Sequence, residues 1–277
     1  MIAVGGKIIH NDYFPDGTML IKLDEGDIRQ NNSFKGNEIG IFWKYENDLE
    51  LVKLIYITKH VKNLGWEPWL EMPYIPNARQ DRIKNKNDVF TLKYFADVIN
   101  WLGFKEVYVL DPHSHVSEAL INNIRVYHAD HFIEQTLRRI SKTEGREFVE
   151  DIIMFYPDEG AMKRYSGMIK KPYLFGIKNR DWETGEIKGL DVVGDTEAIK
   201  GKPILIVDDI CSYGGTFYHS AKKLKELGAG KIYLYVSHCE DSIFEGKLLE
   251  CRLIERVFTT DSIVRKGSSD FLTVFEA

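Results

Sequence analysis

The sequence has few cysteines and no excess of positive charge. It contains three cysteines in 277 residues, Cys211, Cys239 and Cys251, and none has the CxxC spacing of a zinc site. An odd number without such a framework favours a reducing compartment. Acidic residues outnumber basic ones by 42 to 37, for a formal net charge of −5. Because nucleic-acid-binding proteins carry a basic surface, this balance speaks against a nucleic-acid partner.

Long apolar runs are also missing. No segment approaches the roughly 20 apolar residues that a membrane-spanning helix needs, and the opening stretch MIAVGGKIIHNDYF is too polar for a signal peptide. The sequence therefore predicts a cytoplasmic protein without a membrane partner. Hydrophobic residues make up 44% and charged residues 29%, which is the composition of a globular protein with one large core or two smaller ones.

What the chain does have is an alternation of apolar, strand-like runs with segments of helical composition. We expect strands at 39–45, 68–75, 105–113, 124–129, 151–160, 172–177, 203–209, 232–238 and 256–263. We expect helices at about 47–64, 88–102, 130–142, 160–168 and 216–227. This alternation is typical of a parallel α/β sheet. The length favours two domains, with a boundary near 125–130.

Two local patterns in the first half give sharper expectations. Asp16-Gly17 lies between β-rich runs and predicts a hairpin of strands 7–10 and 18–23 around the turn 14–18. The helix expected at 47–64 has Leu51, Ile55, Thr58 and Lys62 at recurrent spacing, with Asn47 or Asp48 as its cap and Gly65 as its stop.

The segment PILIVDDICSYGGT, residues 203–216, carries the strongest chemical signal. An apolar strand ends in Asp208 and Asp209, a small-residue loop follows, and a helix begins near Thr216. Backbone N–H groups at such a helix start, together with the helix dipole, bind anions. The two carboxylates suit sugar hydroxyls or a metal ion rather than phosphate. An ordinary strand–turn–helix with a solvated acidic turn is the alternative, and it requires the acids, glycines and Thr216 to coincide by accident.

Two further clusters lie where strands of the first half end. Arg79 and Gln80, in the run ARQDR, offer a guanidinium and an amide suited to polyphosphate and to a purine edge. A solvated charged turn is the alternative for this run. His113 follows a strand in Asp111-Pro112-His113, although a lone histidine is more often structural than a ligand.

Two clusters of the second half complete the set. Asp158 ends a strand before a glycine turn, and its hard oxygen atoms suit Mg²⁺, which phosphoryl transfer requires. Lys178 and Arg180 stand at the start of a charged, glycine-containing segment, 178–195, that is expected to be an exposed hairpin or a mobile loop. The alternative is that both are surface charges.

The motifs FPDGT, ARQDR, DPH, PDEG, KNR and VDDICSYGGT resemble, in order and approximate spacing, those of the ribose-phosphate pyrophosphokinase family, also called phosphoribosyl pyrophosphate (PRPP) synthetases. The last motif resembles the ribose-phosphate loop of type I phosphoribosyltransferases. The resemblance spans about residues 12–263. It implies an α/β fold of two tandem phosphoribosyltransferase-like domains, 1–128 and 129–277, each a mostly parallel sheet flanked by helices. It also implies Mg²⁺-dependent transfer of the pyrophosphoryl group of ATP to the C1 hydroxyl of ribose 5-phosphate, giving PRPP and AMP.

The resemblance further implies roles for individual residues and an assembly. The residues implied to contact ATP are Phe14, Asp16, Gly17, Thr18, Arg79, Gln80 and Asp81. Ribose 5-phosphate contacts fall to Asp208, Asp209, Ser212, Tyr213, Gly214, Gly215 and Thr216. Magnesium contacts fall to His113 and Asp158, and Lys178 and Arg180 are the implied catalytic pair. A homo-oligomer, as a dimer or a hexamer built from dimers, is expected as well.

Some positions depart from the family pattern. Ser212 and Tyr213 stand where the family has an acid and a threonine, and Thr18 stands where it has an acid. Because Ser212 keeps a hydroxyl but carries no charge, the affinity for ribose 5-phosphate is expected to differ. Two other functions are compatible with parts of the pattern. One is a phosphoribosyltransferase that consumes PRPP, and the other is a regulatory relative that binds nucleotides without turnover.

Overall fold

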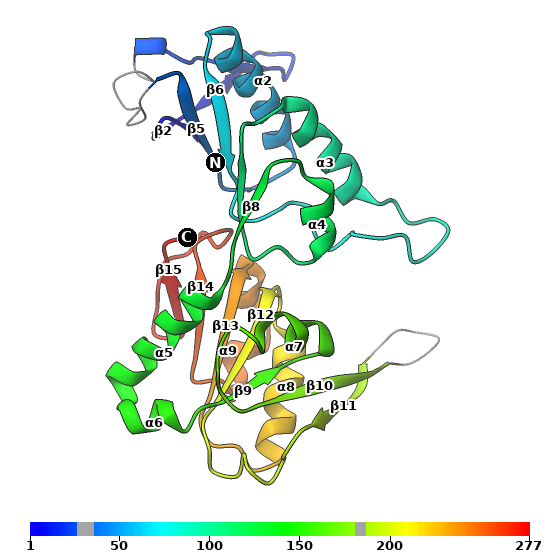
Figure 1. Ribbon diagram of the computed structural model, residues 1–277, viewed down its shortest axis with the longest axis vertical. Helices are drawn as coiled ribbons and strands as arrows, with labels where there is room; N and C mark the ends of the chain where they lie inside the picture. Colours follow the sequence, from blue (N-terminus) through cyan, green and yellow to red (C-terminus); the bar gives the residue numbers. More distant parts are fainter. Residues whose placement is uncertain (27–35, 181–186) are drawn as a thin grey trace. The chain divides into compact units, whose positions relative to one another are not determined.

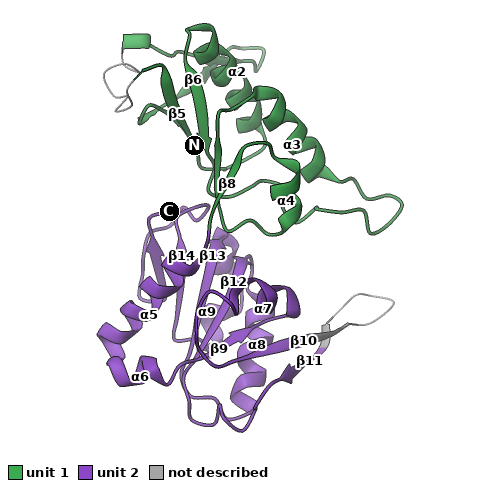
Figure 2. Ribbon diagram, in the orientation of Figure 1, with its two compact units in different colours: residues 1–127 green, residues 128–277 purple. Residues whose placement is uncertain are grey.

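The computed structural model describes residues 1–26, 36–180 and 187–277. The chain divides into two compact units, residues 1–127 and 128–277 (Figure 2). Each unit has its own sheet and its own hydrophobic core.

The first unit is built on a sheet with the strand order β2-β1-β5-β6-β7-β8 (Figure 1). Its strands are β1 (Ile2–Val4), β2 (Lys7–Ile8), β5 (Glu38–Trp43), β6 (Glu67–Glu71), β7 (Val107–Leu110) and β8 (Ile124–Tyr127). The strands from β5 to β8 are parallel, and β1 and β2 are antiparallel. The helices that connect them are α2 (Leu49–Asn63), α3 (Thr91–Leu102) and α4 (His115–Leu120).

The predicted hairpin is partly wrong in its strands. The run 7–10 does not pair with 18–23; instead, Lys7 and Ile8 of β2 pair with β1. The hairpin is formed by β3 (Asn11–Tyr13) and β4 (Met19–Ile21), which flank the predicted turn 14–18. Residues 7 and 8 instead pair locally with β1, as Val4↔Lys7 and Ala3↔Ile8, and so form the edge of the main sheet.

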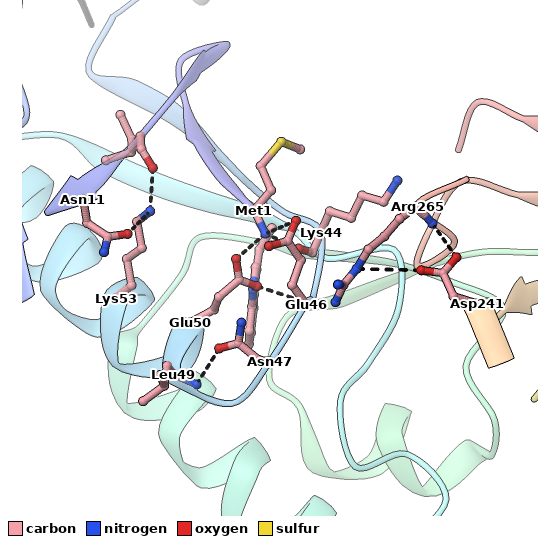
Figure 3. Close-up of polar contacts among 12 residues, drawn as sticks. Met1, Asn11, Lys44, Glu46, Asn47, Leu49, Glu50, Lys53, Asp241 and Arg265 are labelled. Carbon is pink, nitrogen blue, oxygen red and sulfur yellow. Dashed lines mark hydrogen bonds and ion pairs between the residues drawn. The ribbon is translucent and has the colours of Figure 1, made fainter. Parts of the chain in front are cut away.

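The buried face of α2 contains the apolar residues Leu54, Ile57 and Val61. Of the four residues at recurrent spacing, Thr58 is buried. Glu50 and Lys53 turn inward because they have buried partners: Trp43 Nε1 donates to Glu50 at 3.0 Å. Lys53 Nζ donates to the Ile9 carbonyl at 2.5 Å and to the Asn11 side chain at 2.9 Å (Figure 3).

The second unit has a sheet with the strand order β11-β10-β9-β12-β13-β14-β15. Its strands are β9 (Ile153–Tyr156), β10 (Tyr173–Arg180), β11 (Ile187–Val193), β12 (Ile204–Cys211), β13 (Ile232–Cys239), β14 (Arg256–Thr260) and β15 (Leu272–Phe275). All neighbours are parallel except β10 and β11. The helices are α5 (Asp130–Glu144), α6 (Arg146–Glu150), α7 (Glu159–Tyr165), α8 (Gly215–Glu226), the 3₁₀ helix η1 (Asp241–Glu245) and α9 (Leu248–Cys251).

The architecture confirms the predicted α/β fold with mostly parallel sheets and flanking helices. The central strands β9 and β13 are buried at every residue, and the apolar run Ile204–Val207 of β12 between them is buried as well. In the part of the chain that the structure describes, no helix has both the length and the apolar character needed to cross a bilayer.

Candidate functional site

The strand–loop–helix predicted at 203–216 is present in the second unit. Ile204–Val207 are buried in the middle of the sheet, between β9 and β13. The strand ends at Cys211, the chain turns at Gly214 with a left-handed φ of 77°, and α8 begins at Gly215. The first N–H groups of a helix have no partner within the helix, so this loop presents donors to an anion. Thr216 lies partly exposed at this point.

Three carboxylates gather where β12 and β9 end. Asp209 N donates to Asp208 Oδ1 at 3.0 Å. Burial, followed by the negative charges of Asp209 and Asp158, raises the pKa of Asp208 well above its ordinary value. Because β9 and β12 are parallel neighbours, their carboxyl ends meet at one edge of the sheet, which is why Asp158 acts on Asp208.

Arg164, the cation that lies beside these carboxylates, was not identified from the sequence. Arg164 Nη1 lies 3.2 Å from Asp209 Oδ2, and the two side chains are only 20% and 8% exposed. Arg164 comes from α7, the helix that starts directly after Asp158. A basic residue in the last turn of so short a helix was the available signal, since it lies only six residues after Asp158.

Asp158 also has a structural role. Its Oδ1 accepts a hydrogen bond from Ala161 N at 3.0 Å, so it caps the N-terminus of α7. The cap holds the carboxylate at the strand end, beside Asp208. The same side chain therefore fixes the helix and contributes charge to the cluster.

Lys178 and Arg180 lie on β10, which continues three residues beyond the predicted strand 172–177. Lys178 pairs with Leu190 and Arg180 with Ile187 of β11, with a register shift between Asn179 and Arg180. The antiparallel pair confirms the predicted hairpin in this segment. Its tip, residues 181–186, lies outside the described residues.

In the first unit, the ARQDR and DPH segments lie together. Asp81 is 4% exposed, and its carboxylate accepts from Arg82 Nε at 2.7 Å and from Arg82 Nη2 at 3.0 Å. These hydrogen bonds lower the pKa of Asp81 below its ordinary value, with further contributions from Ser114 and the charge of His113. Asp81 therefore orients Arg82, whose side chain is largely exposed.

The remaining residues predicted to contact ATP are exposed. Several of them also form hydrogen bonds to nearby residues. Arg79 and Gln80 are exposed, and Gln80 Oε1 accepts from Thr91 Oγ1 at 2.5 Å. In the hairpin turn, Asp16 Oδ1 accepts from Thr18 Oγ1 at 2.7 Å and from Thr18 N at 2.9 Å. These bonds lower the pKa of Asp16. Thr18 thus stabilises the charged form of the Asp16 carboxylate.

The remaining members of this turn complete it. Phe14 N donates to the Thr18 carbonyl at 2.9 Å, and Gly17 N donates to the Phe14 carbonyl at the same distance. Gly17 has a φ of 84°. The Phe14 side chain is 49% exposed.

The described residues hold no group of three or more His, Cys, Asp or Glu side chains arranged to bind a metal ion. Mg²⁺ is commonly held by one or two carboxylates, with water and substrate phosphate oxygens as its other ligands. The carboxylates of Asp158 and Asp208 fit such a partial site by their chemistry and their proximity.

Comparison with known proteins gives a consistent group of relatives. Ribose-phosphate pyrophosphokinase of Saccharolobus solfataricus is 27% identical over 237 residues, covering 83% of this chain and 76% of that protein. The protein of the same name from Thermococcus kodakarensis is 26% identical over 267 residues, covering 94% and 88%. The family model "Phosphoribosyl synthetase-associated domain" matches residues 181–270.

A crystal structure of phosphoribosylpyrophosphate synthetase from Mycobacterium smegmatis has the same fold. The two chains superpose with a TM-score of 0.75 at 21% identity, over 97% of this chain and 86% of that one. The fold is thus that of the phosphoribosyltransferase-like α/β class. Within that class, the chain is similar along most of its length to ribose-phosphate pyrophosphokinases.

Proposed function

We propose that this protein is a ribose-phosphate diphosphokinase, which transfers the pyrophosphoryl group of ATP to the C1 hydroxyl of ribose 5-phosphate and releases PRPP and AMP. The observation that carries the proposal is the second unit's site. There, Asp208 and Asp209 precede the anion-binding loop and α8. Arg164 and Asp158 lie beside these two acids. This arrangement offers acceptors for sugar hydroxyls beside donors for a phosphate.

The substrates divide between the two units. Asp208 and Asp209 accept hydrogen bonds from ribose hydroxyls, and the loop from Ser212 to Thr216 donates to the 5-phosphate. The first unit binds ATP through Arg79, Gln80 and the hairpin turn from Phe14 to Thr18. Asp81 contributes by fixing the Arg82 guanidinium.

The chemistry requires one bond to form and one to break. The C1 oxygen of the sugar forms a bond to the β-phosphorus of ATP, the bond between that phosphorus and the α–β bridging oxygen breaks, and the C1 hydroxyl loses its proton. No protein nucleophile is needed, so positioning and charge carry the rate. Lys178 and Arg180 supply positive charge to the oxygens on which negative charge develops.

We expect Mg²⁺ as the cofactor; Asp158 and His113 would each offer it a ligand, and when bound it would neutralise charge on phosphate oxygens. The crowding of carboxylates around Asp208 supports a cation requirement, because a negative cluster favours binding of a divalent ion.

Incubation with ATP, Mg²⁺ and ribose 5-phosphate, with AMP and ADP resolved by chromatography, tests the proposal. We expect AMP to form in equal amount with PRPP. ADP would indicate a simple kinase instead. The absence of both nucleotide products would overturn the proposal in favour of a transferase that consumes PRPP or a regulatory nucleotide-binding protein.

A further inference from the structure

The chain that follows β13 packs against the back of the proposed sugar-phosphate loop, Ser212–Gly215. Glu240 N donates to the Cys211 carbonyl at 2.8 Å, which ties the end of β13 to the start of the loop. The next turn, η1, is held at its first residue, because Arg265 N donates to Asp241 Oδ1 at 3.1 Å (Figure 3). The segment from 241 to 248 is thus anchored where it meets the loop.

Gly246 makes the closest approach to the loop. A Cβ atom at this position would overlap the Tyr213 carbonyl oxygen and would lie 2.8 Å from the Tyr213 carbonyl carbon. The backbone of Gly246, with φ −90° and ψ 169°, is one that any residue adopts. The requirement for glycine here is therefore one of space alone, and the atoms it makes room for are loop backbone.

A second contact lies one residue further along the loop. A Cβ atom on Gly214 would lie 2.6 Å from Leu248 Cγ, and Leu248 is completely buried. Two consecutive loop residues, Tyr213 and Gly214, thus rest on Gly246 and Leu248 respectively. The loop has a rigid support behind it while Tyr213 keeps its side chain exposed to solvent.

We infer that Gly246 is a positioning residue for ribose 5-phosphate, because it lets the loop backbone sit where its N–H groups reach the 5-phosphate. This inference rests on the proposed function. Hydrogen-bond donors must hold a phosphate within a fraction of an ångström, so a methyl group that pushes the Tyr213 carbonyl forward displaces the donors that follow it.

The test compares Gly246→Ala with Gly267→Ala in the full chain. Gly267 has no atom within 4 Å of an added Cβ, so its variant is the matched control. Titration calorimetry with ribose 5-phosphate alone, and with ATP alone, measures each affinity without turnover. We expect Gly246→Ala to bind ribose 5-phosphate at least about tenfold more weakly and ATP within about twofold of the original. Gly267→Ala is expected to leave both affinities unchanged.

The outcomes separate this inference from the proposed function. Unchanged ribose 5-phosphate affinity in Gly246→Ala, or an equal loss for both ligands, overturns the inference and leaves the proposed function standing. An original protein that binds neither ribose 5-phosphate nor inorganic phosphate overturns both. If Gly246→Ala does not fold, Leu248→Ala replaces it, since loss of that side chain removes the support behind Gly214. The same selective weakening is then expected, and its absence overturns the inference.

Discussion

Asp208 and Asp209 are neighbours in the sequence but have different electrostatic surroundings. Asp209 has a guanidinium partner in Arg164, whereas Asp208 has carboxylates on both sides, from Asp209 and Asp158. Burial, followed by these like charges, raises the pKa of Asp208 well above its ordinary value. The surroundings, rather than the residue type, therefore distinguish the two acids.

We expect Arg164→Gln to weaken ribose 5-phosphate binding by about tenfold and to lower the free energy of unfolding by about 1–3 kcal/mol. The reason is that Asp209 loses its counter-charge in a place with little solvent. Titration calorimetry and chemical denaturation measure the two effects. Arg138→Gln is the control, because its pair with Glu134 is exposed and exposed pairs contribute little. An Arg164 variant that matches this control would remove Arg164 from the site.

We expect Asp208→Asn to stabilise the fold at pH 7 while it weakens ribose 5-phosphate binding by about tenfold or more. The folded-state pKa of Asp208 is raised, so its stabilising contribution is full below the ordinary carboxyl pKa of about 4 and is lost as pH rises through the raised value. Asn at position 208 carries no charge, so the variant does not lose this stability as the pH rises.

Unfolding of the Asp208 variant at pH 4 and pH 7 checks this sign. The gain in stability should be present at pH 7 and small at pH 4. Asp97→Asn, at an exposed position on α3, is the control and should change stability little at either pH. Equal stability of the Asp208 variant and the original protein at pH 7 would contradict the prediction.

At the scale of elements, α7 connects the acidic cluster to the fold. Asp158 caps this helix at its first turn, and Arg164 reaches Asp209 from its last turn. A helix of only seven residues thus carries one member of the cluster at each end. Any change that unwinds α7 is expected to disturb both contacts.

The two roles of Asp158 can be separated by substitution. Asn caps helices as well as Asp does, whereas Ala costs about 1 kcal/mol. We expect Asp158→Asn to keep the stability of the original and to raise the Mg²⁺ concentration for half-maximal activity at least about tenfold. Asp158→Ala should show both defects. If Asp158→Asn has an unchanged Mg²⁺ requirement, its carboxylate serves only as a cap.

At the scale of the whole molecule, each unit has its own sheet, core and set of candidate site residues. The reaction proposed for the chain needs both sets. We predict that the chain assembles as a homo-oligomer, a dimer or a hexamer built from dimers. Light scattering coupled to size exclusion checks this against the chain mass of 32.1 kDa. A single species at that mass, independent of concentration, would count against assembly.

The site could be predicted where its parts are adjacent in the sequence. Asp208 and Asp209 lie near the end of the strand Ile204–Cys211 and the loop up to Thr216 follows it, so their placement near a helix start needed no long-range information. Arg164 was missed because a basic residue on a short helix has many possible partners. Only the pairing of β9 with β12 brings it to Asp209.

The same division applies to the fold. The alternation of apolar runs and helical segments determined the α/β class and the main parallel strands, because periodicity is a local property of the chain. The inward turn of Glu50 and Lys53 and the close contact of Gly246 with Tyr213 were decided by tertiary structure. Both depend on a partner in another segment of the chain, so neither can be predicted from the residues on one side of the contact alone.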